Sequence, residues 1–167
     1  MKKRNLETCF SPALYEAERH KSSIVVFIDI LRATSAICSA FANGVRTIIP
    51  VETVDEAREY KKKGFLVAAE RDGIILDFAD FGNSPFNFTR DRIEGKTVVY
   101  STTNGTGIIK LASSAEYVVI GSFLNISALS EWILNKKQDV LLFCAGWKNR
   151  FNLEDSVCAG AFAERLI

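Results

Sequence analysis

The chain has 167 residues, 48% of them hydrophobic and 25% charged, a composition that suits one compact domain with a buried core. Its 21 basic and 20 acidic side chains almost cancel, so no broad electrostatic field favours nucleic acid or an anionic membrane surface. The single histidine, His20, excludes histidine-rich zinc sites and leaves only one imidazole for a serine or cysteine nucleophile.

No segment has the features of a targeting signal or a membrane span. The basic start at 1–5 is not followed by the long apolar stretch of a signal peptide. The longest apolar runs, at 24–28 and 140–144, are far too short to cross a bilayer. The four cysteines are widely spaced without a C-x-x-C pair, which argues against a disulfide framework or a cysteine metal site. We therefore expect a reduced, cytoplasmic protein.

Strand-like and helix-like segments alternate along the chain. We expect a strand at 24–29, a helix at 32–43, a strand at 46–51, a helix at 53–64 with a capping box, and a strand at 65–69. A long loop at 70–83 precedes a helix that begins at Ser84-Pro85. The remaining elements are a strand at 97–101, a helix at 105–113, a strand at 116–121, a helix at 127–135, a strand at 139–144 and a helix at 153–167.

This alternation predicts one layered α/β/α domain over 1–167, with a largely parallel or mixed sheet. The last helix carries no capping residue at its end, so we expect the chain to be cut short of its natural C-terminus.

Polar residues gather just after the predicted strands. In open α/β sheets, ligands bind in the crevice beyond the carboxyl ends of the strands. Residues from distant parts of the sequence are therefore expected along one edge of the sheet. The residues concerned are Asp29, Arg32, Glu70, Arg71, the segment 102–106, Ser122, Asn125 and Gly146.

The segment 102–106 is a candidate phosphate cradle. It contains three hydroxyls, an amide and a glycine where a strand turns into a helix, namely Thr102, Thr103, Asn104, Gly105 and Thr106. Unpaired backbone N–H groups and the helix dipole favour an anion at such a turn, and a glycine allows a close approach. The alternative is an ordinary Asn-Gly turn with a helix N-cap.

A second candidate is the stretch Asp29-Ile-Leu-Arg32-Ala-Thr34. An aspartate at the end of an apolar strand can hold Mg²⁺ or attack phosphorus, and Arg32 can bind a phosphate or carboxylate with two N–H groups. A helix cap with an adjacent salt bridge is the structural alternative. Haloacid-dehalogenase phosphatases also have an aspartate after an apolar strand, but they carry a second aspartate two positions later. This chain has Leu31 there, which argues against that similarity.

Three further groups have both a functional and a structural interpretation. Glu70 could ligate a metal and Arg71 could neutralise an anionic substrate, or the two could form a surface pair. Asn83 and Ser84 could contact a phosphate or simply start a helix. Glu154 and Asp155 offer oxygen ligands for a metal, but acidic residues also stabilise the first turn of a helix.

Taken in this order, the motifs resemble the 2-phosphosulfolactate phosphatase (ComB-like) family. The resemblance covers 24–167 and includes, besides the stretches above, Ala42-Asn43-Gly44, Gly121-Ser122-Phe123, Cys144-Ala145-Gly146 and Ala159-Gly160. It implies a Mg²⁺-dependent acid phosphatase that converts 2-phosphosulfolactate, a small anionic phosphoester, to sulfolactate and phosphate on the way to coenzyme M. Asp29, Glu154 and Asp155 are the candidate metal ligands, and Asp29, Arg32, Glu70 and Arg71 the candidate catalytic residues.

Two other functions remain open. A non-catalytic module that binds a sugar phosphate or another anion would keep the cradle and the arginines but need no essential carboxylate. A phosphotransferase would use the same site with an acceptor alcohol in place of water. The sequence also leaves the oligomeric state open, a homo-oligomer included.

Overall fold

The computed structural model describes residues 4–18, 23–102 and 111–167. Within this part of the chain the strands form two four-stranded sheets, A with the order β1-β8-β2-β7 and B with the order β3-β6-β4-β5. The strands are β1 (Leu6–Cys9), β2 (Ile24–Ile28), β3 (Thr47–Pro50), β4 (Leu66–Arg71), β5 (Ile74–Ile75), β6 (Thr97–Ser101), β7 (Tyr117–Gly121) and β8 (Val140–Cys144). The helices are α1 (Pro12–Glu18), α2 (Ala33–Ala42), α3 (Val54–Lys62), the 3₁₀ helix η1 (Pro85–Asn87), α4 (Arg90–Ile93), α6 (Ile126–Lys136) and α7 (Leu153–Leu166).

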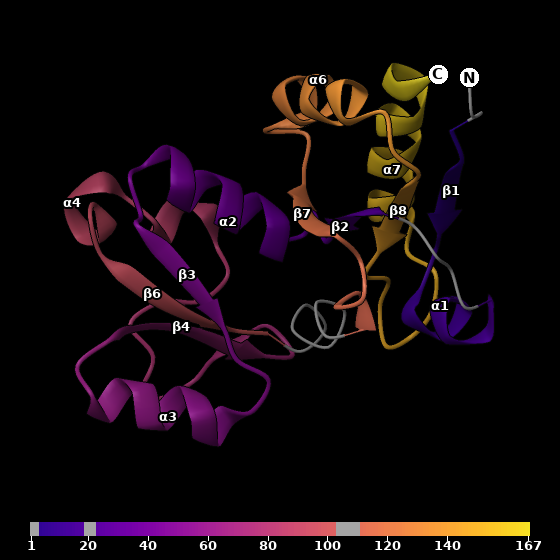
Figure 1. Ribbon diagram of the computed structural model, residues 1–167. Coiled ribbons are helices and arrows are strands. Elements are labelled where there is room, and N and C mark those ends of the chain that lie inside the picture. The colour runs from indigo at the N-terminus through magenta and orange to yellow at the C-terminus, as the bar shows by residue number, and fades with distance from the viewer. Residues whose placement is uncertain (1–3, 19–22, 103–110) are drawn as a thin grey trace.

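The predicted α/β class with a largely parallel or mixed arrangement is confirmed. Every pairing within sheet A is parallel, and in sheet B only β4 and β5 run antiparallel. Figure 1 shows the two sheets next to each other, each with helices packed on it. The division into two sheets was not predicted, because alternating patterns give the order of elements but not which strands pair.

Sheet A is buried on both faces because its central strands are apolar throughout. All five residues of β2 and of β8 are buried. Ile24, Val26 and Ile28 pack in one cluster with Phe162 of α7, while Val25 and Phe27 belong to a second cluster on the other face. This is the continuous hydrophobic pattern expected of parallel strands covered by helices.

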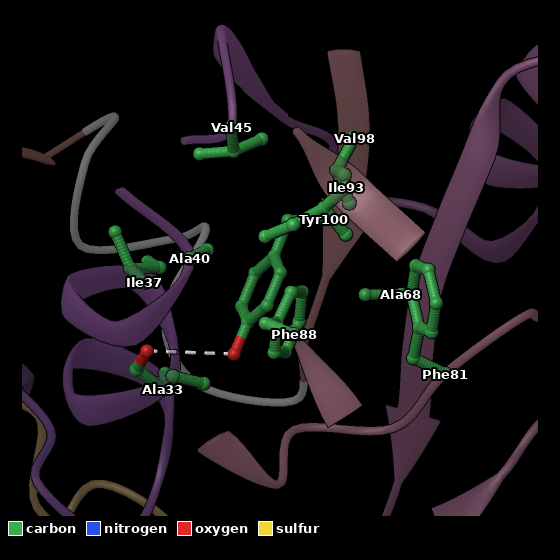
Figure 2. Close-up of a cluster of buried hydrophobic side chains, with 11 residues drawn as sticks. Ala33, Ile37, Ala40, Val45, Ala68, Phe81, Phe88, Ile93, Val98 and Tyr100 are labelled. Carbon is green, nitrogen blue, oxygen red and sulfur yellow. Dashed lines mark hydrogen bonds between the residues drawn. The ribbon is translucent and has the colours of Figure 1, made fainter. Parts of the chain in front are cut away.

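Helix α2 links the two sheets, because it starts after β2 of sheet A but packs on sheet B. Its residues Ala33, Ile37 and Ala40 lie against Tyr100 of β6, together with Phe88 (Figure 2). The Tyr100 hydroxyl donates a hydrogen bond of 3.5 Å to the carbonyl oxygen of Ala33. The start of α2 is thereby held beside the carboxyl ends of the strands of sheet B.

Several local predictions are confirmed. Thr53 and Glu56 form the expected capping box at the start of α3, with both reciprocal hydrogen bonds present. The strand expected at 97–101 has these bounds in the structure, and the other predicted strands shift by one or two residues at their ends.

Other local predictions need correction. Glu70 and Arg71 are the last residues of β4 and not part of a loop that follows it. The segment expected to be a long loop contains β5, joined to β4 by Asp72 and Gly73, both with positive φ. An Asp-Gly pair favours such a two-residue hairpin turn. The helix expected after Ser84-Pro85 is a single 3₁₀ turn, and most of the helix expected at 105–113 lies outside the described residues.

The first strand and helix, β1 and α1, were not predicted. β1 is a short strand that extends sheet A by pairing with β8, with Leu6 opposite Val140. None of the helices in the described ranges is long and apolar enough to cross a bilayer.

Candidate active site

The carboxyl ends of strands from both sheets meet around the start of α2. Arg32, which follows β2 of sheet A, contacts Glu70 at the end of β4 in sheet B. Asp72 and Lys148 form a second contact between the sheets, with 3.6 Å between the carboxylate and the ammonium. Of the predicted cradle, Thr102 is described and buried, while Thr103, Asn104, Gly105 and Thr106 lie outside the described residues.

Asp29 lies between β2 and α2 and contacts the first turn of the helix. Its Oδ1 accepts a hydrogen bond of 3.4 Å from the backbone N–H of Ala33. The backbone groups of Asp29 are bonded to Thr34, whose N–H donates to the Asp29 carbonyl at 2.8 Å. Asp29 therefore supports the helix start, as the structural alternative required, while its Oδ2 accepts no hydrogen bond from the described residues.

The electrostatic surroundings of Asp29 are unusual for a helix cap. Its pKa is raised from 3.8 to about 7, mainly by burial and then by the negative charges of Asp155, Glu154 and Glu70, against the Ala33 hydrogen bond, which lowers it. These three neighbouring charges are negative and disfavour a further negative charge on this carboxyl. A perturbed carboxyl group at the end of a strand is a mark of many functional sites.

Arg32 and Glu70 form an ion pair between the segment that follows β2 of sheet A and the end of β4 in sheet B. The Arg32 Nη2 donates to both oxygens of Glu70, at 3.4 and 3.2 Å. Glu70 Oε2 also accepts a hydrogen bond of 2.8 Å from the backbone N–H of Asn83. A Cβ at Gly82 would lie 2.9 Å from the same oxygen, so glycine is needed there for Glu70 to fit. The Arg32 side chain stays 43% exposed and can still face a ligand.

Arg71 is held at the end of β4 next to the start of the predicted cradle. Its Nη2 donates to the Ser101 hydroxyl at 2.8 Å, and its Nη1 donates to the carbonyl oxygen of Glu70 at 2.8 Å. Ser101 immediately precedes Thr102. Arg32 is therefore bonded to the carboxylate of Glu70 and Arg71 to its carbonyl oxygen, so hydrogen bonds fix both guanidinium groups.

The remaining predicted residues differ in how far their polar groups are already used. Asn125 accepts from the N–H of Ser122 and donates to the carbonyl of Ile120, so both ends of its amide serve the turn after β7. Asn83 is buried, and its Oδ1 has no hydrogen-bond partner. Ser84 precedes η1 without a side-chain capping bond. The binding roles predicted for these residues stay predictions.

Comparison with known proteins places the chain in a family. A sequence model of the 2-phosphosulpholactate phosphatase family matches residues 9–167. The chain belongs to this family. The match covers nearly all of the chain, as the resemblance of its ordered motifs implied.

Several curated relatives are similar over most of this chain. A protein from Thermotoga maritima is 48% identical over 141 residues, and one from Caldanaerobacter subterraneus is 41% identical over 150 residues. One from Clostridium perfringens is 36% identical over 167 residues. Each is named a probable 2-phosphosulfolactate phosphatase. The aligned parts cover 84%, 87% and 96% of this chain but only 61%, 62% and 68% of the relatives. The chain thus spans less than two thirds of the length of the first two.

The magnesium ion that the family resemblance implied can be tested against the donor atoms. Asp29 has an oxygen that accepts no hydrogen bond from the described residues, and the charges that raise its pKa are negative, which suits a cation. In the described ranges, no three His, Cys, Asp or Glu side chains converge as a metal-binding group. Mg²⁺ commonly binds one or two carboxylates and keeps water or phosphate oxygens as its other ligands, so Asp29 fits such a site.

Two side chains of the site were not singled out from the sequence. Ser101 binds Arg71, and Asn152 donates hydrogen bonds to Glu154 and to Asp155. Asn152 directly precedes α7, and an asparagine before a helix is a recognisable signal. No sequence pattern singles out Ser101 as a site residue, because it is simply the last residue of a buried strand.

Proposed function

We propose that this chain carries the catalytic site of a phosphatase that hydrolyses 2-phosphosulfolactate, or a closely related small 2-phospho acid, to sulfolactate and phosphate with Mg²⁺. The observation that supports this most directly is the network in which Arg32 and Arg71 are both hydrogen-bonded to Glu70 at the strand ends, with Asp29 nearby. The family relationship and the names of the relatives agree with it. The reaction would take place in the cytoplasm as a step toward coenzyme M.

The arginines would bind the substrate. 2-Phosphosulfolactate has a phosphate, a sulfonate and a carboxylate, and a guanidinium group can bind each of them through two parallel N–H groups. Arg32 retains exposed surface and Arg71 is fixed beside Ser101, so the two could contact different anionic groups of one ligand. Their charges would also oppose the negative charge on the phosphoryl oxygens as the reaction proceeds.

Asp29 would hold the metal ion. When bound, Mg²⁺ would stabilise charge on the phosphoryl oxygens and on the leaving group. The raised pKa of Asp29 means that a proton must leave this carboxyl before it can act as a ligand. Glu154, half-buried and in the first turn of α7, is close enough to affect the pKa of Asp29 and could supply a further oxygen.

Hydrolysis requires a water oxygen to bond to phosphorus while the bond from phosphorus to the C2 oxygen breaks. The leaving alkoxide gains a proton, and the attacking water loses one. If Asp29 attacks phosphorus in place of water, an acyl phosphate forms on its carboxylate and water then releases phosphate. Acid quenching during turnover with radiolabelled substrate distinguishes the two routes, since only the second leaves label on the protein.

The test is phosphate release from 2-phosphosulfolactate and from a panel of small phosphate monoesters, with Mg²⁺ and with excess EDTA. Because the relatives are longer, both this chain and a form extended to their length should be assayed. We expect turnover with Mg²⁺ that stops with EDTA; undiminished turnover in EDTA would contradict the metal. Phosphate binding without release would support an anion-binding module, and phosphate transfer to an added alcohol would support a phosphotransferase.

A further inference from the structure

Asp155 has the contacts of a structural clamp more than those of an open metal ligand. Its side chain is 1% exposed, and both carboxylate oxygens accept hydrogen bonds. Oδ1 accepts from the backbone N–H of Ile30 at 2.9 Å. Oδ2 accepts from the backbone N–H of Gly146 at 3.3 Å and from Nδ2 of Asn152 at 2.8 Å. Few lone pairs remain for a cation.

These hydrogen bonds join three segments that are distant in sequence. Ile30 follows β2, Gly146 follows β8, and Asn152 precedes α7. Gly146 has φ of +62°, and a Cβ there would lie 2.2 Å from the carbonyl oxygen of Arg150. The turn after β8 is therefore tight, and Asp155 ties it to the segment that carries Asp29.

The connection to Asp29 is direct along the backbone. The N–H bound by Asp155 belongs to the peptide group between Asp29 and Ile30. On its other side, Asp29 is fixed by Thr34, whose Oγ1 accepts from the Asp29 N–H at 3.2 Å. The peptide groups on both sides of the Asp29 Cα are therefore held, which limits the directions its carboxylate can take.

We propose that Asp155 is a positioning residue, which holds the backbone after β2 so that Asp29 faces the reacting phosphate, and that it is not itself a ligand of Mg²⁺. This inference rests on the proposed phosphatase function. It assigns the two acids of the first turn of α7 to different tasks: Asp155 holds the backbone, and Glu154 remains available to the metal.

The test compares Asp155→Asn with the unaltered protein in its longest available form. Asparagine keeps one acceptor oxygen but places an NH₂ group where Oδ2 accepted two hydrogen bonds. We expect kcat to fall on the order of 100-fold, as for a misplacement of roughly 1 Å, while the KM for substrate changes less than about threefold. The Mg²⁺ dissociation constant, measured by calorimetry without substrate, should rise less than it does in Asp29→Asn, because the Asp29 carboxylate that holds the ion is shifted but still present.

Each other outcome overturns the inference in a recognisable way. A Mg²⁺ dissociation constant raised as far as in Asp29→Asn would make Asp155 a metal ligand. A lower Tm with an unchanged kcat would make it purely structural. If the unaltered protein releases no phosphate under any condition, the proposed function fails, and the role of Asp155 in turnover fails with it.

Two further variants keep the test decisive. If Asp155→Asn does not fold, Asn152→Ala removes the 2.8 Å hydrogen bond to Oδ2 together with the 3.1 Å hydrogen bond to Glu154, and it should lower kcat severalfold with a smaller loss of Mg²⁺ affinity than in Asp29→Asn. A wild-type kcat in that variant would count against the clamp. Glu164→Gln is the matched control, because it removes one carboxylate charge from an exposed position of the same helix. Its kcat and Mg²⁺ affinity should equal those of the unaltered protein.

Discussion

Two regions of the site contain the same kinds of residue in opposite electrostatic conditions. At the end of β4, Glu70 is paired with Arg32 and accepts the N–H of Asn83, so its charge is compensated within the protein. At the end of β2, Asp29 is half-buried and is acted on by three other acids, and its pKa rises to about 7. One carboxylate is part of a completed network, and the other has no positive partner among the described residues.

This difference suggests a division of labour. A carboxylate already bound to an arginine has little uncompensated negative charge to attract a cation. We expect such a carboxylate to orient the arginine instead. A buried carboxylate surrounded by like charges is destabilising when ionised, and a divalent cation would remove that penalty. We therefore expect substitutions at the two strand ends to affect different measured quantities, and the predictions below test this from the largest effect to the smallest.

Asp29→Asn should have the largest effect. We expect kcat to fall on the order of 10³-fold or more, because a neutral amide cannot serve as the anionic ligand or nucleophile. Phosphate release and thermal unfolding should be measured together. If Asp29 were only a helix cap, asparagine would replace it almost fully and turnover would stay close to that of the unaltered protein.

Arg32→Lys should have an intermediate effect. Lysine keeps the charge but loses the forked geometry, and a hydrogen bond to a charged group contributes about 1.5–3 kcal/mol, which corresponds to roughly 10–150-fold in kcat/KM. Steady-state kinetics should show this loss while Mg²⁺ affinity stays constant. A change in Mg²⁺ affinity equal to that of Asp29→Asn would remove the distinction between the two regions.

The pH dependence of stability should reveal the uncompensated carboxyl. Because folding raises the pKa of Asp29 from 3.8 to about 7, the folded state favours the protonated form. Its contribution to stability is therefore fully present below pH 3.8 and is lost as the pH rises through 7.

Without Mg²⁺, we expect the free energy of unfolding, measured with urea from pH 5 to pH 8, to fall more steeply in the unaltered protein than in Asp29→Asn. Saturating Mg²⁺ should offset the loss at pH 8. Equal slopes for the two proteins would show that Asp29 is not buried as an uncompensated acid.

The exposed pair between the sheets should have the smallest effect. Asp72 and Lys148 are 64% and 63% exposed at 3.6 Å, and such pairs contribute about 0.2–1 kcal/mol or less. A double-mutant cycle with Asp72→Ala and Lys148→Ala should give a coupling energy in this range that decreases at high salt. A coupling energy above about 2 kcal/mol would mean that this contact, and not only Arg32 with Glu70, holds the sheets together.

Much of the fold followed from local sequence patterns. The capping box at Thr53 and the strand that ends at Ser101 needed only neighbouring residues, and both were predicted correctly. The pairing of strands could not be predicted in this way. β2 pairs with β7 and β8, which begin about a hundred residues later in the chain, and no local pattern specifies that partner.

The site was predictable to a similar extent. The rule that ligands bind at the carboxyl ends of strands singled out Asp29, Arg32 and Glu70, which are neighbours in the structure, while their catalytic roles stay predictions. The contact between Arg32 and Glu70 depends on α2 leaving sheet A to pack on sheet B, which is a tertiary feature. The sequence pattern predicts Asp155 as a metal ligand and could not show the hydrogen bonds that its carboxylate accepts, because an acidic residue in a first helical turn looks the same in both cases.

The order of strands also has a consequence for synthesis on the ribosome. All pairings of sheet B lie between β3 and β6, so that sheet can assemble once Ser101 has left the exit tunnel. Sheet A has no complete pair at that point, because β2 waits for β7 and β1 waits for β8. At about 5–20 residues per second, a further 2–9 s or so pass before Cys144 has also left the tunnel. Until then the apolar strand β2 lacks at least one of its two neighbouring strands and is open to non-native contacts.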